Sequence, residues 1–127
     1  MNPEQYAKTS EHSHQVALFI WAQQNQQIYP ELKWMHAIHN QGHGDKVRGG
    51  KAKAEGVRAG VFDVFVPAAR GIYHGLYIEM KAPGKIKDTS AVQDEFRAFA
   101  DEQHYATCVC DSWWLARDRV IEYMGLL

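Results

Sequence analysis

Apolar and polar residues alternate most regularly over residues 75–81, and this period of two predicts a β-strand. The two sets lie on opposite faces of that strand: Leu76, Ile78 and Met80 on one, and Tyr77, Glu79 and Lys81 on the other. Pro83 and Gly84 end the strand. Taken alone, Glu79 and Lys81 also fit the solvated face of an edge strand, where their Cα atoms lie roughly 7 Å apart.

A second strand is predicted over residues 61–66, where one carboxylate interrupts an apolar run. Asp63 is flanked by valine and phenylalanine, and a carboxylate buried there needs a hydrogen-bonding partner, an opposite charge or a metal ion. Residues 67–74 are rich in turn formers and short enough to join the two strands as a hairpin. We therefore expect Asp63 and Glu79 to lie on adjacent strands.

Helical periodicity and capping residues predict the remaining elements. Ser10, Ser90 and Ser112 are expected N-caps, and Ser90 with Gln93 has the pattern of a capping box. The predicted elements are a helix over residues 11–24, a helical turn leading into a strand over 32–38, a loop over 40–44, a helix over 48–55 ended by Gly56, the two strands above, a helix to about residue 103, a strand over 105–110 and a helix up to residue 123. Apart from the short helix, this α-β-β-β-α-β-α order predicts an α/β fold.

Two helices have a face of particular interest. In the first, Glu11 begins a stripe that continues through Gln15, Leu18 and Ala22, which aims its carboxylate toward the core. The alternative is that Glu11 only interacts with the helix dipole, worth ~0.3–1 kcal/mol. In the helix after Ser90, the stripe predicted to be buried is Val92, Phe96, Phe99 and Ala100.

Composition narrows the class of protein. The chain has 127 residues, 46% of them hydrophobic, which suits one folded domain over residues 10–127 after a flexible N-terminus at 1–9. It contains no run of 18 apolar residues and no signal-peptide pattern, so we expect a cytoplasmic protein without membrane contact. The two cysteines are interpreted as reduced core residues, and the seven histidines do not combine a zinc-binding spacing with a second pair of ligands, so structural or surface roles are favoured for them.

The charge is unevenly distributed, although the net charge is only −1. Residues 46–87 contain nine basic and three acidic residues, a net charge of +6, whereas the rest of the chain carries −7. A basic segment in an acidic protein indicates a face that binds a polyanion such as DNA. The residues assigned to that face are Lys46, Arg48, Lys51, Lys53, Arg58, Lys85 and Lys87.

Asp63, Glu79 and Lys81 together suit the hydrolysis of a phosphodiester. Two carboxylates on adjacent strands can bind Mg²⁺ or Mn²⁺, because hard cations prefer oxygen ligands. Such a cation polarises a phosphate oxygen and lowers the pKa of a bound water. Lys81 can then orient that water or balance the charge on the phosphorus.

The spacing of these residues resembles the PD-(D/E)xK nuclease superfamily, since fifteen residues separate Asp63 from Glu79-Met80-Lys81. The surrounding motifs are similar to its VRR-NUC family, in particular to small stand-alone phage and bacterial members. They cover most of the chain: Glu11-x-x-x-Gln15, Ala37-Ile38-His39-Asn40-x-Gly42, Lys53-Ala54-Glu55-Gly56-Val57-x-Ala59-Gly60-Val61-x-Asp63, Gly75-Leu76-x-Ile78-Glu79-x-Lys81, and Gln93.

This resemblance implies a restriction-endonuclease-like core with a mixed β-sheet flanked by helices, and a metal-dependent DNA endonuclease. Asp63, Glu79 and the main-chain carbonyl of Met80 would hold Mg²⁺ or Mn²⁺, with Glu11 supporting the metal directly or through water. Lys81 would assist the nucleophile, and Gln93 would line the site. Family members act on DNA, and the small ones are associated with branched structures such as four-way junctions, often as homodimers, in a bacterial or phage-infected cell.

Two positions depart from the family pattern. Phe62 and His39 stand where the family commonly has proline; the first of those prolines binds no metal, so we expect activity to survive, whereas His39 affects the shape of its loop. Gln93 has two open roles, as the N3 residue of the capping box and as a site residue. The alternative function is a catalytically inactive DNA-binding protein or a phage structural protein on the same fold.

Overall fold

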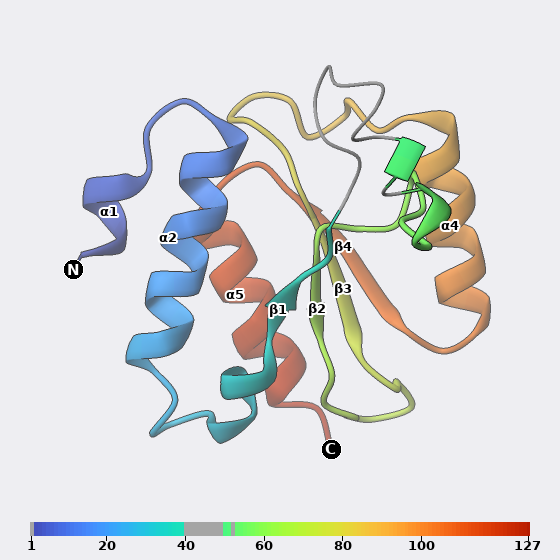
Figure 1. The fold of residues 1–127 in the computed structure, drawn as a ribbon. Coiled ribbons are helices and arrows are strands. Elements are labelled where there is room, and N and C mark those ends of the chain that lie inside the picture. Colours follow the sequence, from blue (N-terminus) through green and yellow to red (C-terminus); the bar gives the residue numbers. More distant parts are fainter. Residues whose placement is uncertain (1, 40–49, 52) are drawn as a thin grey trace.

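The computed structural model describes residues 2–39, 50–51 and 53–127, and its centre is a four-stranded sheet with helices on both faces (Figure 1). The strands lie in chain order: β1 (His36–Ala37), β2 (Val64–Val66), β3 (Leu76–Met80) and β4 (Ala106–Cys110). β2 is antiparallel to β1 and β3, whereas β4 runs parallel to β3. The predicted α/β class with a mixed sheet is confirmed.

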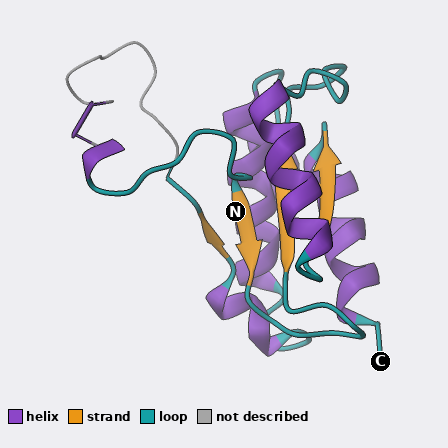
Figure 2. Ribbon diagram, turned by 90° about the vertical axis from the view of Figure 1, so that its right-hand side faces the viewer, coloured by secondary structure: helices purple, strands orange, loops and turns teal. Residues whose placement is uncertain are grey.

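The helices form a layer on each side of the sheet. They are α1 (Pro3–Tyr6), α2 (Glu11–Gln24), the 3₁₀ helix η1 (Pro30–Trp34), α4 (Ala91–Glu102) and α5 (Trp113–Met124). α2 and α5 pack together on one face, and α4 covers the other face beside β4 (Figures 1 and 2). Residues 50–51 and 53–54 are also helical, within the helix predicted over 48–55. α1 packs on α2, and the predicted domain limits of 1–9 and 10–127 stay a prediction.

The main core lies between the sheet and the pair α2 and α5. Leu76, Ile78 and Met80 point from β3 into this core, as their alternation predicts. They meet Leu18 of α2 and Val120 of α5, both fully buried. Each such side chain contributes roughly 1.5–3 kcal/mol when it is buried from water. The apolar side chains buried on this face therefore stabilise the sheet. The opposite face of β3 can then hold polar side chains.

The packing on the α4 face is thinner. Fully buried Phe62 lies against Phe96, with ring centroids 5.4 Å apart, and Tyr77 lies against the same ring at 5.1 Å. The predicted core stripe of α4 is correct for Ala100 and partly for Phe96, but Val92 and Phe99 are 43% and 58% exposed. In the described part of the chain, α4 is the one helix that covers this face of the sheet. Side chains on this face that α4 does not reach therefore have no other helix packed over them.

The predicted caps are confirmed, while β2 is shorter than predicted. The hydroxyls of Ser10, Ser90 and Ser112 each accept a hydrogen bond from a backbone N–H in the first turn of their helices. β2 begins at Val64 rather than at residue 61. Asp63 nevertheless extends the pairing with β1, because its carbonyl accepts a hydrogen bond of 2.7 Å from Ile38 N–H.

Two further sequence predictions concern cysteine and membranes. Cys108 and Cys110 are free thiols on one face of β4, with their sulfur atoms 3.8 Å apart, as expected for reduced residues. Among the described residues, none of the helices has the length and apolar character needed to cross a bilayer.

Buried His14 ties α2 to the start of α5. Its Nδ1 accepts a hydrogen bond of 2.9 Å from Trp113 N–H, and its Nε2 lies 3.1 Å from the Lys8 carbonyl oxygen. Because Nδ1 is the acceptor, the proton is on Nε2, which donates to Lys8. A neutral ring therefore satisfies two backbone groups that are distant from each other in sequence.

Replacement of this ring is expected to destabilise the fold. His14→Ala leaves the buried Trp113 N–H without an acceptor, which costs about 1–3 kcal/mol in free energy of unfolding, in addition to the cavity. His12→Ala, at an exposed position on the same helix, is the control and should change stability by less than about 0.5 kcal/mol. Urea denaturation measures both. Equal stabilities of the two variants would contradict a structural role for His14.

Candidate functional site

Asp63 and Glu79 face each other across the β2–β3 hairpin. The register pairs Val64 with Ile78, so the next pair outward is Asp63 with Glu79, and both side chains point to the α4 face of the sheet. The Asp63 carboxylate accepts a hydrogen bond of 3.0 Å from the Met80 N–H, which fixes it at the end of β3. The hairpin thus brings together two acids that are separated by fifteen residues in sequence.

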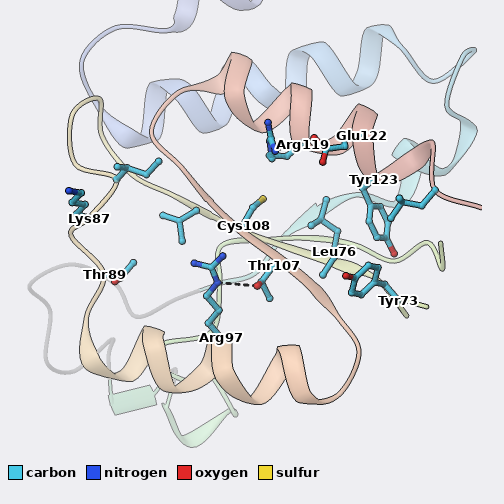
Figure 3. A pocket seen from close by; sticks show the side chains of 14 residues that line it. Tyr73, Leu76, Lys87, Thr89, Arg97, Thr107, Cys108, Arg119, Glu122 and Tyr123 are labelled. Atoms are coloured by element: carbon cyan, nitrogen blue, oxygen red, sulfur yellow. Dashed lines mark hydrogen bonds and ion pairs between the residues drawn. The ribbon is translucent and has the colours of Figure 1, made fainter. Parts of the chain in front are cut away.

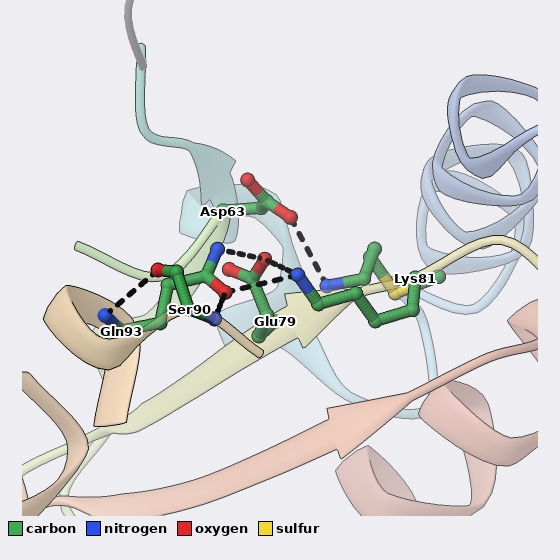
Figure 4. A network of polar contacts seen from close by, with 6 residues as sticks. Asp63, Glu79, Lys81, Ser90 and Gln93 are labelled. Carbon is green, nitrogen blue, oxygen red and sulfur yellow. Dashed lines mark hydrogen bonds and ion pairs between the residues drawn. The ribbon is translucent and has the colours of Figure 1, made fainter. Parts of the chain in front are cut away.

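Glu79 is almost completely buried, with 2% of its surface exposed. Its Oε2 atom accepts hydrogen bonds from Gln93 Nε2 at 2.8 Å and from the Lys81 ammonium at 3.2 Å (Figure 4). Its Oε1 atom is also buried, and in the described part of the chain it has no hydrogen-bonding partner. A buried carboxylate oxygen without a donor is costly, so this atom indicates a missing ligand.

Lys81 lies beside Glu79 as the alternation along β3 predicts. Its side chain is 11% exposed, and its ammonium donates to Gln93 Oε1 at 3.0 Å as well as pairing with Glu79. Its backbone N–H donates to the Cys110 carbonyl at 2.8 Å, which extends the β3–β4 ladder by one residue. The ammonium is therefore held between a carboxylate and an amide rather than in solvent.

Gln93 has both of the roles that its sequence context leaves open. Its Oε1 accepts a hydrogen bond of 2.9 Å from Ser90 N–H, and its own N–H donates to Ser90 Oγ at 3.2 Å, which completes the capping box. The same side chain contacts Glu79 and Lys81 through its two amide atoms (Figure 4). The first turn of α4 is thereby attached to the acids of the hairpin.

A glycine permits this close approach. Gly60 has φ of +90°, and a Cβ atom there would lie 2.7 Å from the Val92 carbonyl oxygen. Any other residue would be both strained and in collision with the backbone of α4. Gly60 thus lets the chain that leads to Asp63 pass against the first turn of α4.

Burial and neighbouring charge perturb the titration of Glu79. Desolvation raises the pKa of Glu79 to about 7, and the negative charges of Asp63 and, to a smaller extent, Glu11 add to the rise. The hydrogen bond from Lys81 and its positive charge act in the opposite direction. A strongly perturbed carboxyl group beside a second acid and an ammonium is typical of a functional site.

The donor set fits a hard divalent cation. Glu79 Oε1 and the Asp63 carboxylate supply oxygen atoms, the ligands that Mg²⁺ and Mn²⁺ prefer, and the part of the Met80 carbonyl stays a prediction. Among the described residues, no three His, Cys, Asp or Glu side chains are grouped closely enough to hold a metal ion. The carboxylates therefore number two, and the other ligands would be main-chain oxygen and water.

Glu11 lies at the exposed start of α2 rather than inside the site. Its charge still contributes to the raised pKa of Glu79, so the two groups interact electrostatically. The buried face of α2 runs through His14, Leu18 and Trp21. Its support of a metal ion, directly or through water, stays a prediction.

Five of the seven basic residues assigned to DNA binding lie in the described part of the chain. Lys51, Lys53, Arg58, Lys85 and Lys87 are all exposed, whereas Lys46 and Arg48 lie outside the described residues. Lys85 and Lys87 belong to the loop between β3 and α4, directly before Ser90. Their role in binding DNA stays a prediction.

Sequence reasoning missed one backbone contribution to the site, the Met80 N–H that holds Asp63. No side-chain pattern marks such a backbone donor. The Ser90 N–H that holds the Gln93 amide is part of the predicted capping box and is confirmed.

The raised pKa of Glu79 predicts how stability depends on pH without metal. Between its ordinary value of 4.5 and about 7, the folded state binds more protons than the unfolded state, so the free energy of unfolding falls as pH rises. The loss is of order 3 kcal/mol at most. Glu79→Gln removes this loss, whereas Glu95→Gln, at an exposed position on α4, keeps it. Urea denaturation between about pH 5 and 8 with a chelator measures both, and the same pH slope in Glu79→Gln and wild type would contradict the shift.

Comparison with known proteins supplies independent support for the fold. No family model matches the chain, and none of the curated proteins matches it. A solved structure described as "VRR_NUC domain protein" superimposes with a TM-score of 0.75 and 25% identity, over 94% of this chain and 92% of the other. The chain thus has a nuclease-domain fold, and the resemblance to the VRR-NUC family that its sequence motifs predict is confirmed.

Proposed function

We propose that this protein is a metal-dependent DNA endonuclease that hydrolyses phosphodiester bonds. The observation that carries the proposal is the buried Glu79 carboxylate next to Asp63 and Lys81, one oxygen of which has no donor among the described residues. Such an arrangement destabilises the metal-free protein, so it indicates a function that needs the charge. The VRR_NUC structural neighbour supports the same class of activity.

Asp63, Glu79 and the Met80 carbonyl would hold Mg²⁺ or Mn²⁺. When bound there, the cation supplies Lewis acidity and a water of lowered pKa. Lys81 carries a positive charge at the edge of the two acids, where it can stabilise negative charge on a phosphate. Gln93 holds the Lys81 ammonium and the Glu79 carboxylate in place, so it acts as a positioning residue.

We further propose branched DNA, such as four-way junctions, as the substrate, and a homodimer as the active form. The basic loop of Lys85 and Lys87 lies at the same end of α4 as Gln93, which suits contact with phosphates near the cut. The proposal includes two copies because a symmetric junction requires two matched cuts, and each chain supplies one candidate pair of acids.

Cleavage assays test the central proposal. Wild-type protein is expected to cut DNA in Mg²⁺ or Mn²⁺ and not with a chelator, with duplex, flap and four-way substrates compared in parallel. Asp63→Asn and Glu79→Gln should each reduce the rate by at least about 100-fold, because loss of a direct ligand exceeds the 10–100-fold effect of a supporting residue. DNA binding without metal should be unchanged or tighter, since each variant loses a negative charge.

Asp118→Asn, at an exposed position on α5, is the matched control and should cut normally. Absence of cleavage by the wild-type protein on every substrate, with binding retained, would instead favour the catalytically inactive DNA-binding alternative.

A pair of variants separates the two roles of Gln93. Ser90→Ala removes the hydroxyl that accepts from Gln93 N–H, whereas Gln93→Ala removes the other half of the capping box, the Oε1 that accepts from Ser90 N–H, together with the contacts with Glu79 and Lys81. Both should lose about 0.5–2 kcal/mol in free energy of unfolding. Only Gln93→Ala should also lower the cleavage rate, by roughly 10–100-fold. If the two variants cut equally well, Gln93 serves the helix alone.

A further inference from the structure

A cavity runs along the outer edge of β4, between α4 and α5, with a volume of about 690 Å³ (Figure 3). Four consecutive residues of β4 line it, from Ala106 to Val109. Because neighbouring side chains of a strand point to opposite faces, a cavity that touches all four must follow the strand edge itself. We call this cavity the β4 groove.

The charged residues that line the β4 groove are predominantly basic. Arg97 projects from α4, Arg119 from α5, and Lys87 from the loop before α4, against one lining carboxylate, Glu122 (Figure 3). Glu122 pairs with Arg119 at 3.1 Å. Arg97 donates from Nε to Thr107 Oγ1 at 3.1 Å, and in the described structure neither of its terminal nitrogens makes a hydrogen bond. Thr107 in turn donates to Asp101.

The β4 groove lies next to the site of Glu79 in sequence and in sheet register. Arg97 follows Gln93 by four residues on α4, so the two side chains lie on one helix face a single turn apart. On the sheet, Val109 of the groove is the register partner of Glu79. At the upper end, Thr89 lines the groove and directly precedes Ser90. A chain leaving the acids therefore meets the groove without crossing a barrier of another element.

The volume of the β4 groove and the residues that line it indicate which kind of ligand binds there. A volume of this size is in the range that holds a small-molecule-sized segment. Beyond Arg97 a second cavity shares four residues with the β4 groove, Tyr73, Arg97, Ala106 and Thr107, and adds Ile72, Asp101, His104 and Tyr105. A basic groove that ends at aromatic rings is the arrangement that binds single-stranded nucleic acid through phosphates and stacked bases.

A second copy of the chain is a poorer occupant. Antiparallel pairing of two β4 edges in one sheet places the two-fold axis perpendicular to the sheet, so α4 lies beside its own copy. That arrangement brings each Arg97 toward the other Arg97, and like charges oppose the contact. The charge of the groove instead complements a polyanion.

We propose that the β4 groove binds a single-stranded DNA segment that extends from the duplex held at the Asp63–Glu79 site. This proposal rests on the proposed DNA substrate and adds a second, non-catalytic contact that favours substrates with a single-stranded tail. Arg97 and Arg119 bind phosphates of the tail, and Lys87 directs the strand from the site into the groove.

Fluorescence anisotropy in metal-free buffer tests the proposal without cleavage. The probes are one labelled blunt duplex and the same duplex with a tail of about ten thymidines, a length within the range of single-strand sites. Wild-type protein should bind the tailed duplex about tenfold more tightly, and Arg97→Gln/Arg119→Gln should bind the two within about twofold. For the tailed probe, we also expect a shallower plot of log association constant against log salt concentration in the double variant. Its slope should fall in magnitude by about 1.4, because two phosphate contacts are lost.

Arg117→Gln is the matched control, since this arginine lies on α5 over the Trp113 ring and not in the groove; it should keep the tail preference. The proposal is overturned if wild-type protein binds both probes equally, or if the double variant weakens both equally. Displacement of the tail by a poly-glutamate peptide that binds more tightly than thymidines would assign the groove to an acidic peptide instead. Because binding is measured without metal, absence of cleavage would refute the nuclease proposal and would not contradict the proposal that the groove binds single-stranded DNA.

Discussion

A carboxylate buried in a sheet must be compensated, and Glu79 obtains its compensation from Lys81, directly after β3, and from Gln93 of α4. Asp63, directly before β2, adds a second negative charge opposite Glu79. The hydrophobic face of β3 makes this possible, because Leu76, Ile78 and Met80 anchor the strand in the α2–α5 core. The polar face of the same strand can then hold charges at a cost that packing on the other face offsets.

Much of this arrangement follows from local rules. Strict alternation along β3 and a short connection after Pro67 are enough to predict that Asp63 and Glu79 are neighbours, and the register confirms it. Serine caps likewise predict the starts of the helices. These features depend on residues close together in sequence, where periodicity and capping chemistry decide the structure.

Features that depend on the third dimension were predicted less well. The stripe of α4 was assigned to the core, yet Val92 and Phe99 are exposed, because periodicity cannot show how much of a helix the sheet covers. Glu11 shares a helix face with Leu18, but its position in the first turn places it at the surface. The β4 groove is formed by α4, α5 and a strand edge, so no contiguous stretch of sequence indicates it.

The double engagement of Gln93 has a consequence for motion. Its side chain closes the first turn of α4 and clamps the Glu79–Lys81 pair with the same two amide atoms. Fraying of that turn, ordinarily a low-energy local opening, therefore dismantles the polar cluster at the same moment. The first turn of α4 and the polar cluster around Glu79 therefore open and close together, as one cooperative unit. A bound phosphate or cation that steadies the acids would consequently slow hydrogen exchange in the first turn of α4, at amides that it never touches.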